Sequence, residues 1–303
     1  MTYDLIGDVH GQFLKLKNVL EHLGYKKKKG VYSKENHCAI FIGDLVDRGE
    51  NTVEVVELVK NMVEQGFAEA IMGNHEYNLF GYLTKDDKNN FLRPHNAKNT
   101  KQVINTLVSY NKKDKLLEEH LDWMTNLPLY INKPEFRAVH ACWDKASYQY
   151  IQKNMGSVMS KKNLVESYEC GSKLENAVKM MLTGPELKLP KEFSQKDSEG
   201  HFRTAMRYAW WNKIKDKTYQ EIAIKDSEFL PNIGVDIPDN FESQHYSSKR
   251  KPLFFGHYSM KGEPELMTSN VCCLDWVNKR NRIAVYRFKD EKILKAKNLK
   301  WFF

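Results

Sequence analysis

Five short segments of the chain carry carboxylate, amide and imidazole side chains that could hold metal ions. Mixed imidazole and oxygen ligands suit manganese, iron or zinc better than magnesium or calcium, which prefer all-oxygen shells. A carboxylate shared by two ions can hold them about 3.5 to 4 Å apart, as in two-metal hydrolases. The sequence therefore predicts a metal site and leaves the metal open. The residues concerned are Asp8 and His10, Asp44 and Asp47, Asn74 and His75, His140, and His257.

The first three of these segments each follow a short apolar run that reads as a strand. Tyr3–Gly7 precedes Asp8 and is followed by a helical pattern over Phe13–Leu23; Cys38–Ile42 is followed in the same way by Val53–Val63. A third run, Ala70–Met72, leads into Asn74. Strands that alternate with helices predict a parallel sheet, and ligands bind where the carboxyl ends of such strands open into loops. We therefore expect the polar clusters to meet at one edge of the sheet.

The remaining pattern favours one catalytic domain over residues 1–303 with an insert. Polar helices are expected up to about Leu127, and then strands that return to the sheet. From 144 to 250 the periodicity weakens and prolines interrupt it, which is typical of a cap or insert. The later strands are expected within Leu129–His140, with Phe136–Val139 carrying His140, within Pro252–His257, within Val271–Asp275 and within Arg282–Phe288.

Composition excludes several classes of protein. The chain has 303 residues, of which 41% are hydrophobic, and a net charge of +8, so disordered and fibrous classes are excluded. No apolar run approaches the roughly 18 residues of a membrane span, and the first motif leaves no room for a signal peptide, so we expect a cytoplasmic protein without a membrane partner. Five cysteines without CxxC spacing indicate reduced, mostly buried thiols, Cys142 among them.

Three motifs carry a family resemblance. Gly7-Asp8-Val9-His10-Gly11, Gly43-Asp44-Leu45-Val46-Asp47-Arg48-Gly49 and Gly73-Asn74-His75-Glu76 resemble the signatures of calcineurin-like metallophosphoesterases. They most resemble the phosphoprotein phosphatase branch, which includes Ser/Thr protein phosphatases and bacterial diadenosine tetraphosphatases. Val139-His140-Ala141 and Gly256-His257 resemble that branch's later metal histidines. The resemblance implies an α/β fold of four layers, α-β-β-α, with an α-rich insert.

The resemblance also implies roles for residues at the matching positions. Asp8, His10 and Asp44 would bind one divalent ion, and Asp44, Asn74, His140 and His257 the second, with manganese expected first and iron or zinc as alternatives. A metal-held water or hydroxide would attack phosphorus directly. His75 would be the general acid, Asp47 would orient it, and Arg48 and Asn74 would bind the phosphate. Arg203 and Arg207 are candidates for a further phosphate-binding arginine, and Glu76 is expected only to brace the loop.

The substrate class stays open between three alternatives. The leading prediction is a phosphomonoesterase resembling Ser/Thr protein phosphatases, whose partner is a phosphoprotein; the alternative is a hydrolase of bis(5'-nucleosyl) polyphosphates. The charge of +8 and the basic stretch from Lys279 to Lys300 motivate a third class, a nucleic-acid-processing or nucleic-acid-binding metalloprotein, although no groove-reading motif supports it. Trp210 and Trp211 could stack a base, but packing is the preferred interpretation.

Overall fold

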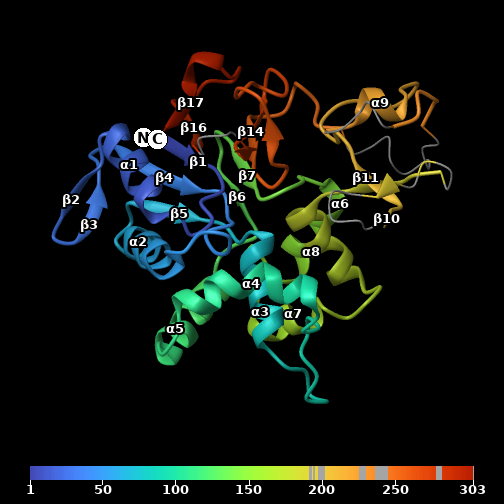
Figure 1. Cartoon of the computed structure of the whole chain (residues 1–303). Helices are drawn as coiled ribbons and strands as arrows, with labels where there is room; N and C mark the ends of the chain where they lie inside the picture. The colour runs from blue at the N-terminus through green and yellow to red at the C-terminus, as the bar shows by residue number, and fades with distance from the viewer. Residues whose placement is uncertain are drawn as a thin grey trace.

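The computed structural model describes most of the chain as two β-sheets flanked by helices (Figure 1). The described residues are 1–190, 193, 195–196, 202–224, 230–235, 245–277 and 282–302, with backbone only at 195–196, 202–203 and 277. Figure 1 shows the two ends of the chain next to each other, beside the first sheet. Within the described part of the chain, no helix combines the length and the apolar character that a membrane span requires.

The first sheet has five strands and holds both ends of the chain. Its parallel part is built from β1, β4 and β5, which pair side by side, while β16 runs antiparallel to β1 and β17 antiparallel to β16. In spatial order its strands are β17 (Leu299–Phe302), β16 (Ile283–Phe288), β1 (Thr2–Ile6), β4 (His37–Phe41) and β5 (Ala68–Ala70).

The second sheet has four strands. β7 and β14 both run parallel to β12, and β6 pairs with β7 antiparallel. The strands expected within Leu129–His140, which the sequence pattern assigned to a return into the first sheet, therefore lie in this separate sheet as β6 and β7. A pattern of apolar residues does not determine which neighbour a strand pairs with. In spatial order the strands of the second sheet are β14 (Val271–Cys273), β12 (Leu253–Phe255), β7 (Arg137–Val139) and β6 (Tyr130–Asn132).

An apolar layer of aromatic and aliphatic side chains joins the two sheets. Phe288 of the first sheet packs against Phe254 of the second, with ring centroids 5.8 Å apart, and against Phe136 at 5.2 Å. Leu5 and Ile40 point into the same layer, whereas their strand neighbours point to the helices, as the two-residue period of a strand requires. Each large side chain buried here contributes about 1.5 to 3 kcal/mol to stability.

Helices cover the outer faces of both sheets, which gives the four-layer α/β architecture that the resemblance implied (Figure 1). α1 (Phe13–Leu23) and α2 (Thr52–Glu64) pack on the first sheet through residues such as Val19 and Val59. α8 (Lys173–Thr183) packs against α6 (Lys145–Asn154) and covers the second sheet. Along the chain, three helices connect β5 of the first sheet to β6 of the second: α3 (Asn74–Leu83), α4 (Ala97–Ser109) and α5 (Asp114–Thr125).

The region proposed as an insert holds short elements around a buried aromatic cluster. Trp210 and Trp211 are buried and pack on Phe255 with ring centroids 5.4 and 5.1 Å away, so neither offers an open face to a nucleobase. The thiol of Cys142 is also buried, and burial raises its pKa. Beside α6 and α8, the elements are α7 (Lys161–Glu166), β8 (Glu186–Lys188), β9 (Gln195–Lys196), β10 (Phe202–Arg203), β11 (Ala205–Arg207) and α9 (Tyr219–Ile222).

Minor elements complete the described part of the chain and differ in places from expectation. β5 ends at Ala70, earlier than the run Ala70–Met72 suggested, and β17 was not expected because Lys300 interrupts its apolar pattern. The four cysteines other than Cys170 are buried, and all five are free thiols. The remaining small elements are the hairpin of β2 (Lys26–Lys28) and β3 (Val31–Ser33), the parallel pair of β13 (Met260–Lys261) and β15 (Trp276–Val277), and the 3₁₀ turn η4 (Ala296–Asn298).

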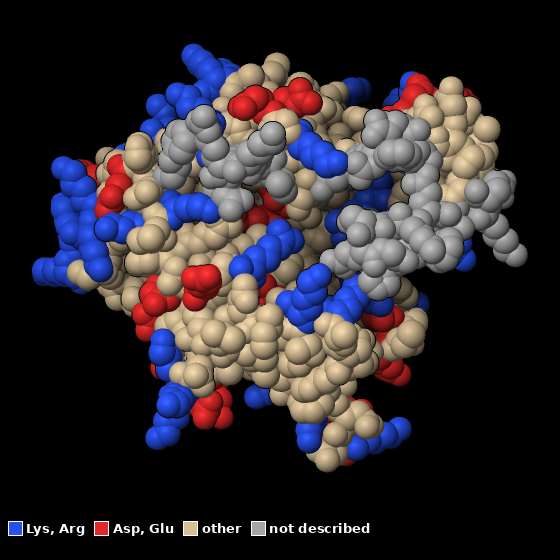
Figure 2. Space-filling view, viewed as in Figure 1, with Lys and Arg blue, Asp and Glu red and all other residues tan. Residues whose placement is uncertain are grey.

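Basic side chains are unevenly distributed over the face seen in Figure 2. They gather at the left edge, where the exposed β2–β3 hairpin carries Lys26–Lys28, and again near the middle, where acidic side chains lie recessed between them. The four consecutive lysines Lys26–Lys29 therefore lie in an exposed hairpin.

Candidate metal centre

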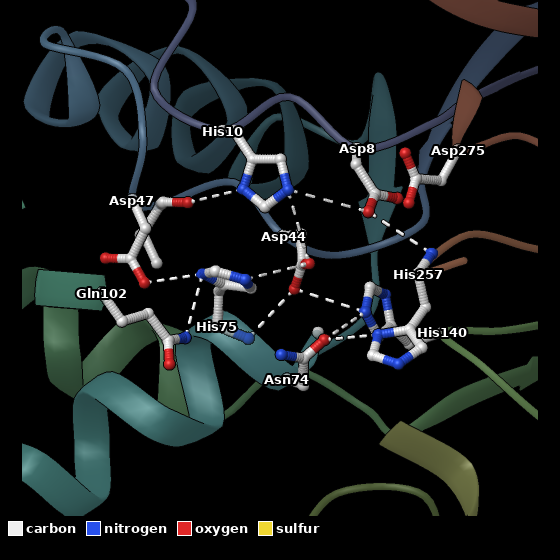
Figure 3. A network of polar contacts seen from close by, with 12 residues as sticks. Asp8, His10, Asp44, Asp47, Asn74, His75, Gln102, His140, His257 and Asp275 are labelled. Atoms are coloured by element: carbon white, nitrogen blue, oxygen red, sulfur yellow. Dashed lines mark hydrogen bonds and ion pairs between the residues drawn. The ribbon is translucent and has the colours of Figure 1, made fainter. Parts of the chain in front are cut away.

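The loops at the carboxyl ends of strands from both sheets meet at one place (Figure 3). Asp8 and His10 follow β1, and Asp44 and Asp47 follow β4. Asn74 and His75 open α3 after β5, while His140 follows β7 and His257 follows β12. The structure thus brings together the eight residues that the sequence singled out on the five segments.

Asp44 lies at the centre of this group and faces both halves of it. Its Oδ2 is 3.6 Å from His10 Nε2, and its Oδ1 is 3.3 Å from His140 Nε2. Two sets of side chains with ligand atoms within 4.8 Å of one another share this aspartate: His10, Asp44 and His75, and Asp44, His140 and His257. A carboxylate with one oxygen toward each set has the geometry of a bridge between two ions.

Backbone carbonyl groups orient two of the histidines. His10 Nδ1 is 3.0 Å from the carbonyl oxygen of Val46, and His140 Nδ1 is 2.7 Å from that of Ile42. A proton on Nδ1 that is donated to a carbonyl fixes the tautomer and leaves Nε2 with a free lone pair, as metal-bound histidines require. Both Nε2 atoms point into the centre.

Asn74 joins the remaining two histidines. Its Oδ1 is 2.9 Å from His140 Nε2 and 2.7 Å from His257 Nδ1. The amide oxygen of Asn74 thus adds a third type of potential metal ligand to the carboxylate and imidazole groups of the centre. Within the described residues, three further buried polar atoms of the centre have no hydrogen-bond partner: Asp8 Oδ1, His10 Nε2 and His257 Nε2. Buried polar atoms without partners are costly, so this donor set fits divalent ions.

The charges of the centre shift the pKa values of its members in opposite directions. Burial and the nearby carboxylates of Asp275 and Asp44 raise the pKa of Asp8 well above its usual value. Burial would also raise the pKa of Asp44, but the surrounding imidazoles hold it well below the usual range. Burial lowers the pKa of His10 to about 3. The imidazole of His10 is therefore neutral and the carboxylates are crowded, and bound cations would relieve this repulsion.

The pKa of His257 is also low. Burial lowers it most, and the positive charge of Arg207 lowers it further. The neutral imidazole that results is the form that binds a metal.

His75 stands at the edge of the centre in a chain of polar contacts. Its Nδ1 is 2.6 Å from Asp47 Oδ2, and Thr106 Oγ1 donates to Asp47 Oδ1 at 2.6 Å. Burial by itself would lower the pKa of His75, but the carboxylates of Asp44 and Asp47 together raise it. His75 Nε2 is 3.8 Å from Asp44 Oδ2, a position compatible with a ligand or with a proton donor to a group bound at the centre.

Two supporting residues of the centre, Gln102 and Asp275, were not predicted from the sequence. Gln102 of α4 places its Nε2 3.1 Å from His75 Nδ1, and no local motif marks it. Asp275 lies beside Asp8 (Figure 3) and accepts hydrogen bonds from the backbone N–H and hydroxyl of Ser259 at 2.6 and 3.0 Å. Its position just after β14 is the same signal that identified Asp8 and Asp44, and it could have been found in that way.

Glu76 organises the second loop. One carboxylate oxygen accepts the N–H groups of Gly73 and Asp44, both at 2.8 Å, and the other accepts those of Leu45 and Val46 at 2.8 and 3.2 Å. Four donors on one buried carboxylate fix the backbone that carries Asp44 to the first turn of α3. These hydrogen bonds show how Glu76 braces the loop, as expected from the sequence.

The metal-site loops adopt a backbone conformation that is rare for residues with a side chain. His10, Asp44, Asp47, Arg48 and His257 have φ angles of 49°, 53°, 69°, 62° and 71°. Such conformations cost of order 1 to 3 kcal/mol each and cluster at functional sites.

Two glycines let these loops approach one another. A Cβ on Gly73 would lie 2.3 Å from Asp44 Oδ1, and one on Gly256 would lie 2.2 Å from Asp8 Oδ1. A side chain at either position would therefore push a carboxylate of the centre out of place.

The arginines flank the centre on both sides. Arg48 is exposed, and its backbone carbonyl accepts a hydrogen bond from Asn105 Nδ2 at 2.6 Å. Arg207 is partly exposed, with its Nε 3.8 Å from Glu186 Oε1 and its guanidinium carbon 6.0 Å from the ring centre of Tyr258. The side chain of Arg203, the other candidate, lies outside the described residues.

Comparisons with known proteins identify a family and several relatives. A sequence model of the family described as calcineurin-like phosphoesterase matches residues 1–189. A bis(5'-nucleosyl)-tetraphosphatase PrpE (asymmetrical) from Halalkalibacterium halodurans is 32% identical over 140 residues, which cover 46% of this chain and 55% of that protein. The protein of the same name from Bacillus subtilis is 31% identical over 144 residues, which cover 46% of this chain and 57% of it. The chain thus spans about half the length of these curated relatives.

A solved structure shares the fold. A protein serine/threonine phosphatase from Saccharomyces cerevisiae superposes with a TM-score of 0.55 at 13% sequence identity, over 100% of this chain and 79% of that one. At this identity the similarity concerns the fold alone.

Proposed function

The chain belongs to the calcineurin-like phosphoesterase family, a family of metal-dependent hydrolases, and from this premise we propose that its buried centre binds two divalent ions and hydrolyses phosphate esters or anhydrides. The observation that carries the proposal is Asp44, whose two oxygens face His10 on one side and His140 on the other. Asp8 and His10 would complete one ion site, and Asn74, His140 and His257 the other. We propose manganese as the ion, with iron or zinc as alternatives.

The ions, when bound, would polarise the phosphoryl oxygens and lower the pKa of water at the centre. Arg48 would bind two phosphate oxygens through its planar guanidinium, and Arg207 would approach from the side of the second sheet. Asn74 would contribute through its amide. Arg203 remains a proposed phosphate-binding residue on the sequence resemblance alone.

His75 would donate the proton that the leaving oxygen requires. Water at the centre would release a proton to solvent, and the resulting hydroxide oxygen would bond to phosphorus as the P–O bond to the leaving group breaks. A proton would pass from His75 Nε2 to the leaving oxygen, and His75 would take up a proton from solvent afterwards. Asp47 would hold the imidazole through Nδ1, at the observed distance of 2.6 Å, and stabilise its charged form. Of the two carboxylates that raise the pKa of His75, Asp47 is not a proposed metal ligand, so its contact with Nδ1 would continue to favour the protonated imidazole when ions are bound.

For the substrate, we propose a dinucleoside polyphosphate. The tetraphosphatases named above are similar in sequence over nearly half of this chain, whereas the resemblance to the serine/threonine phosphatase concerns the fold. These comparisons favour the alternative over the leading expectation of a Ser/Thr phosphatase. A phosphoprotein is the second candidate, since the same centre would serve a phosphomonoester. A nucleic-acid substrate has only the basic surface to support it.

Two assays test these proposals in order. The first measures hydrolysis of p-nitrophenyl phosphate by chelator-treated protein before and after manganese is added, with Asp8→Asn as the control. Activity that returns with the metal and is absent from the variant supports the two-ion proposal, and activity that survives chelation contradicts it. The second compares diadenosine tetraphosphate with a phosphoserine peptide at equal concentration. Faster turnover of the peptide would overturn the substrate assignment and leave the metal centre intact.

A further inference from the structure

A cavity lined mainly by cationic and aromatic side chains lies away from the metal centre. It has a volume of about 390 Å³ and is lined by Arg137, Trp143, Lys145, Tyr148, Gln149, Arg250 and Lys251. Arg137 opens β7 and Lys251 precedes β12, whereas His140 and His257 follow the opposite ends of the same strands. Because a strand rises about 3.3 Å per residue, Arg137 is about 10 Å along β7 from His140. The cavity and the metal centre are therefore separate sites.

Four of the seven lining side chains are cationic. Within the described residues none of them has a carboxylate at ion-pair distance, although Lys251 Nζ donates to the backbone carbonyl of Lys133. Burial and the adjacent Arg137 lower the pKa of Lys251, and the carboxylate of Glu135 offsets this only in part. Like charges held together in a partly buried cavity repel one another, so the free protein carries an electrostatic cost that an anion would remove.

Two of the cations are held on aromatic supports. The guanidinium of Arg137 lies 4.7 Å from the ring centre of Trp143, and that of Arg250 lies 5.4 Å from the ring centre of Tyr246. The Tyr246 hydroxyl is 3.1 Å from Arg137 NH1 and donates to the carbonyl oxygen of Lys251 at 2.9 Å. Trp143 and Tyr246 are buried and fix the positions of these groups. Stacking leaves the N–H groups in the plane of a guanidinium available to oxygen acceptors. In Arg137 the Nε is 3.3 Å from Asn132 Oδ1 and NH1 contacts Tyr246, so NH2 is the nitrogen that would bind a phosphate oxygen.

The size and charge of the cavity select the class of ligand. Four cations match a ligand that carries two or three phosphates better than a single phosphate, and the volume exceeds that of a water-sized or ion-sized site. Tyr148 stacks on Trp143 with ring centroids 4.9 Å apart and, with Gln149, forms part of the wall. We propose that this cavity binds a small anion with two or more linked phosphates, either free or joined to a nucleoside.

Calorimetric titration with inorganic tripolyphosphate, pyrophosphate and ADP tests the proposal on the full chain, both metal-loaded and chelator-treated. Arg250→Gln/Lys251→Gln should weaken binding roughly tenfold or more, because each substitution removes a charged hydrogen-bond donor to the phosphates. Lys161→Gln/Lys162→Gln removes the same charge from exposed positions on α7 and should change affinity less than about twofold. Turnover of p-nitrophenyl phosphate shows that each variant is folded.

Lys145→Gln, at an exposed position on the cavity rim, provides a variant with little risk to folding and should weaken binding by a smaller factor. Equal weakening in the cavity and α7 double variants would overturn the proposal, since it would indicate diffuse attraction to a basic protein. Unchanged binding in the cavity variant with loss in Arg48→Gln would also overturn it, by placing the anion at the metal centre. Tighter binding of ADP than of pyrophosphate would assign part of the affinity to the nucleoside, and equal affinities would assign it to the phosphates.

Discussion

The two sheets contribute to the metal centre in different ways. The first supplies three contiguous loops whose backbones bond to one another, since His10 N–H donates to the carbonyl oxygen of Asp44 at 2.9 Å and Glu76 binds the N–H groups that follow Gly43. The second supplies two single histidines. His140 is positioned by the carbonyl of Ile42, and the backbone N–H of His257 is 3.3 Å from Asp8 Oδ2. The two histidine loops of the second half share one backbone hydrogen bond, from Gly256 N–H to the carbonyl oxygen of His140 at 2.8 Å. The first half is therefore held by several bonds between its own loops, whereas the second half depends in addition on contacts with the first.

The variant Asp44→Asn removes the residue that both halves share and should have the largest effect. An amide offers one neutral oxygen in place of two anionic ones, so we expect both ions to be lost and turnover to fall about a thousandfold or more. Metal content measured by atomic emission, together with p-nitrophenyl phosphate hydrolysis, checks this. His257→Ala, which belongs to the second half only, is the comparison and should release one ion. Two retained ions in Asp44→Asn would exclude the bridging role.

The variant His75→Ala tests whether His75, in the first half, acts as a general acid or as a metal ligand. We expect turnover of phenyl phosphate to fall roughly 100-fold or more, the usual contribution of a general acid, with a smaller loss for p-nitrophenyl phosphate, whose leaving group needs less protonation. Metal content should be unchanged. An equal loss for both substrates accompanied by loss of metal would make His75 a ligand instead.

The variant Glu76→Gln tests the bonding between the loops of the first half. In the unmodified protein each carboxylate oxygen of Glu76 accepts two backbone N–H groups. In the variant an amide NH2 group replaces one of these oxygens, so at least one pair of N–H donors loses its acceptor. We expect a loss of about 2 to 3 kcal/mol in the free energy of unfolding, measured by urea denaturation. Glu50→Gln, at an exposed position in the neighbouring loop, is the control and should change stability by less than about 0.5 kcal/mol.

Substitutions of the two flanking arginines, Arg48 and Arg207, should have the smallest effects, and they compare the two halves directly. Arg48→Lys replaces a planar fork with a point charge and should raise KM about tenfold, whereas Arg207→Lys, partly engaged with Glu186, should raise it less. Steady-state kinetics with diadenosine tetraphosphate measures both. The reverse ranking would shift phosphate recognition to the side of the second sheet.

The comparison also explains which expectations the sequence supported best. Strands β1 and β4 and helices α1 and α2 lie close to their predicted ranges, because their apolar periodicity is strong and each is followed by a dense polar motif. The edge strands β5 and β17 were misplaced or missed, since Glu69 and Lys300 interrupt their patterns. The apolar pattern by itself did not distinguish the second sheet from the first, because strand pairing is decided by contacts between distant segments. The two β layers were expected only from the family resemblance.

The sequence by itself determined which kinds of side chain form the centre. Carboxylate, imidazole and amide groups follow one another in the order Asp8, His10, Asp44, Asn74 and His75, with a glycine before each loop, and this combination indicates a site for divalent metal ions. Only the tertiary structure decided that Asp44 directs one oxygen to each half, that Asp275 lies beside Asp8, and that Arg137 and Arg250 share one cavity. The reason is physical. Residue types and short spacings are local properties, whereas the convergence of side chains from two sheets depends on how the apolar layer between the sheets packs.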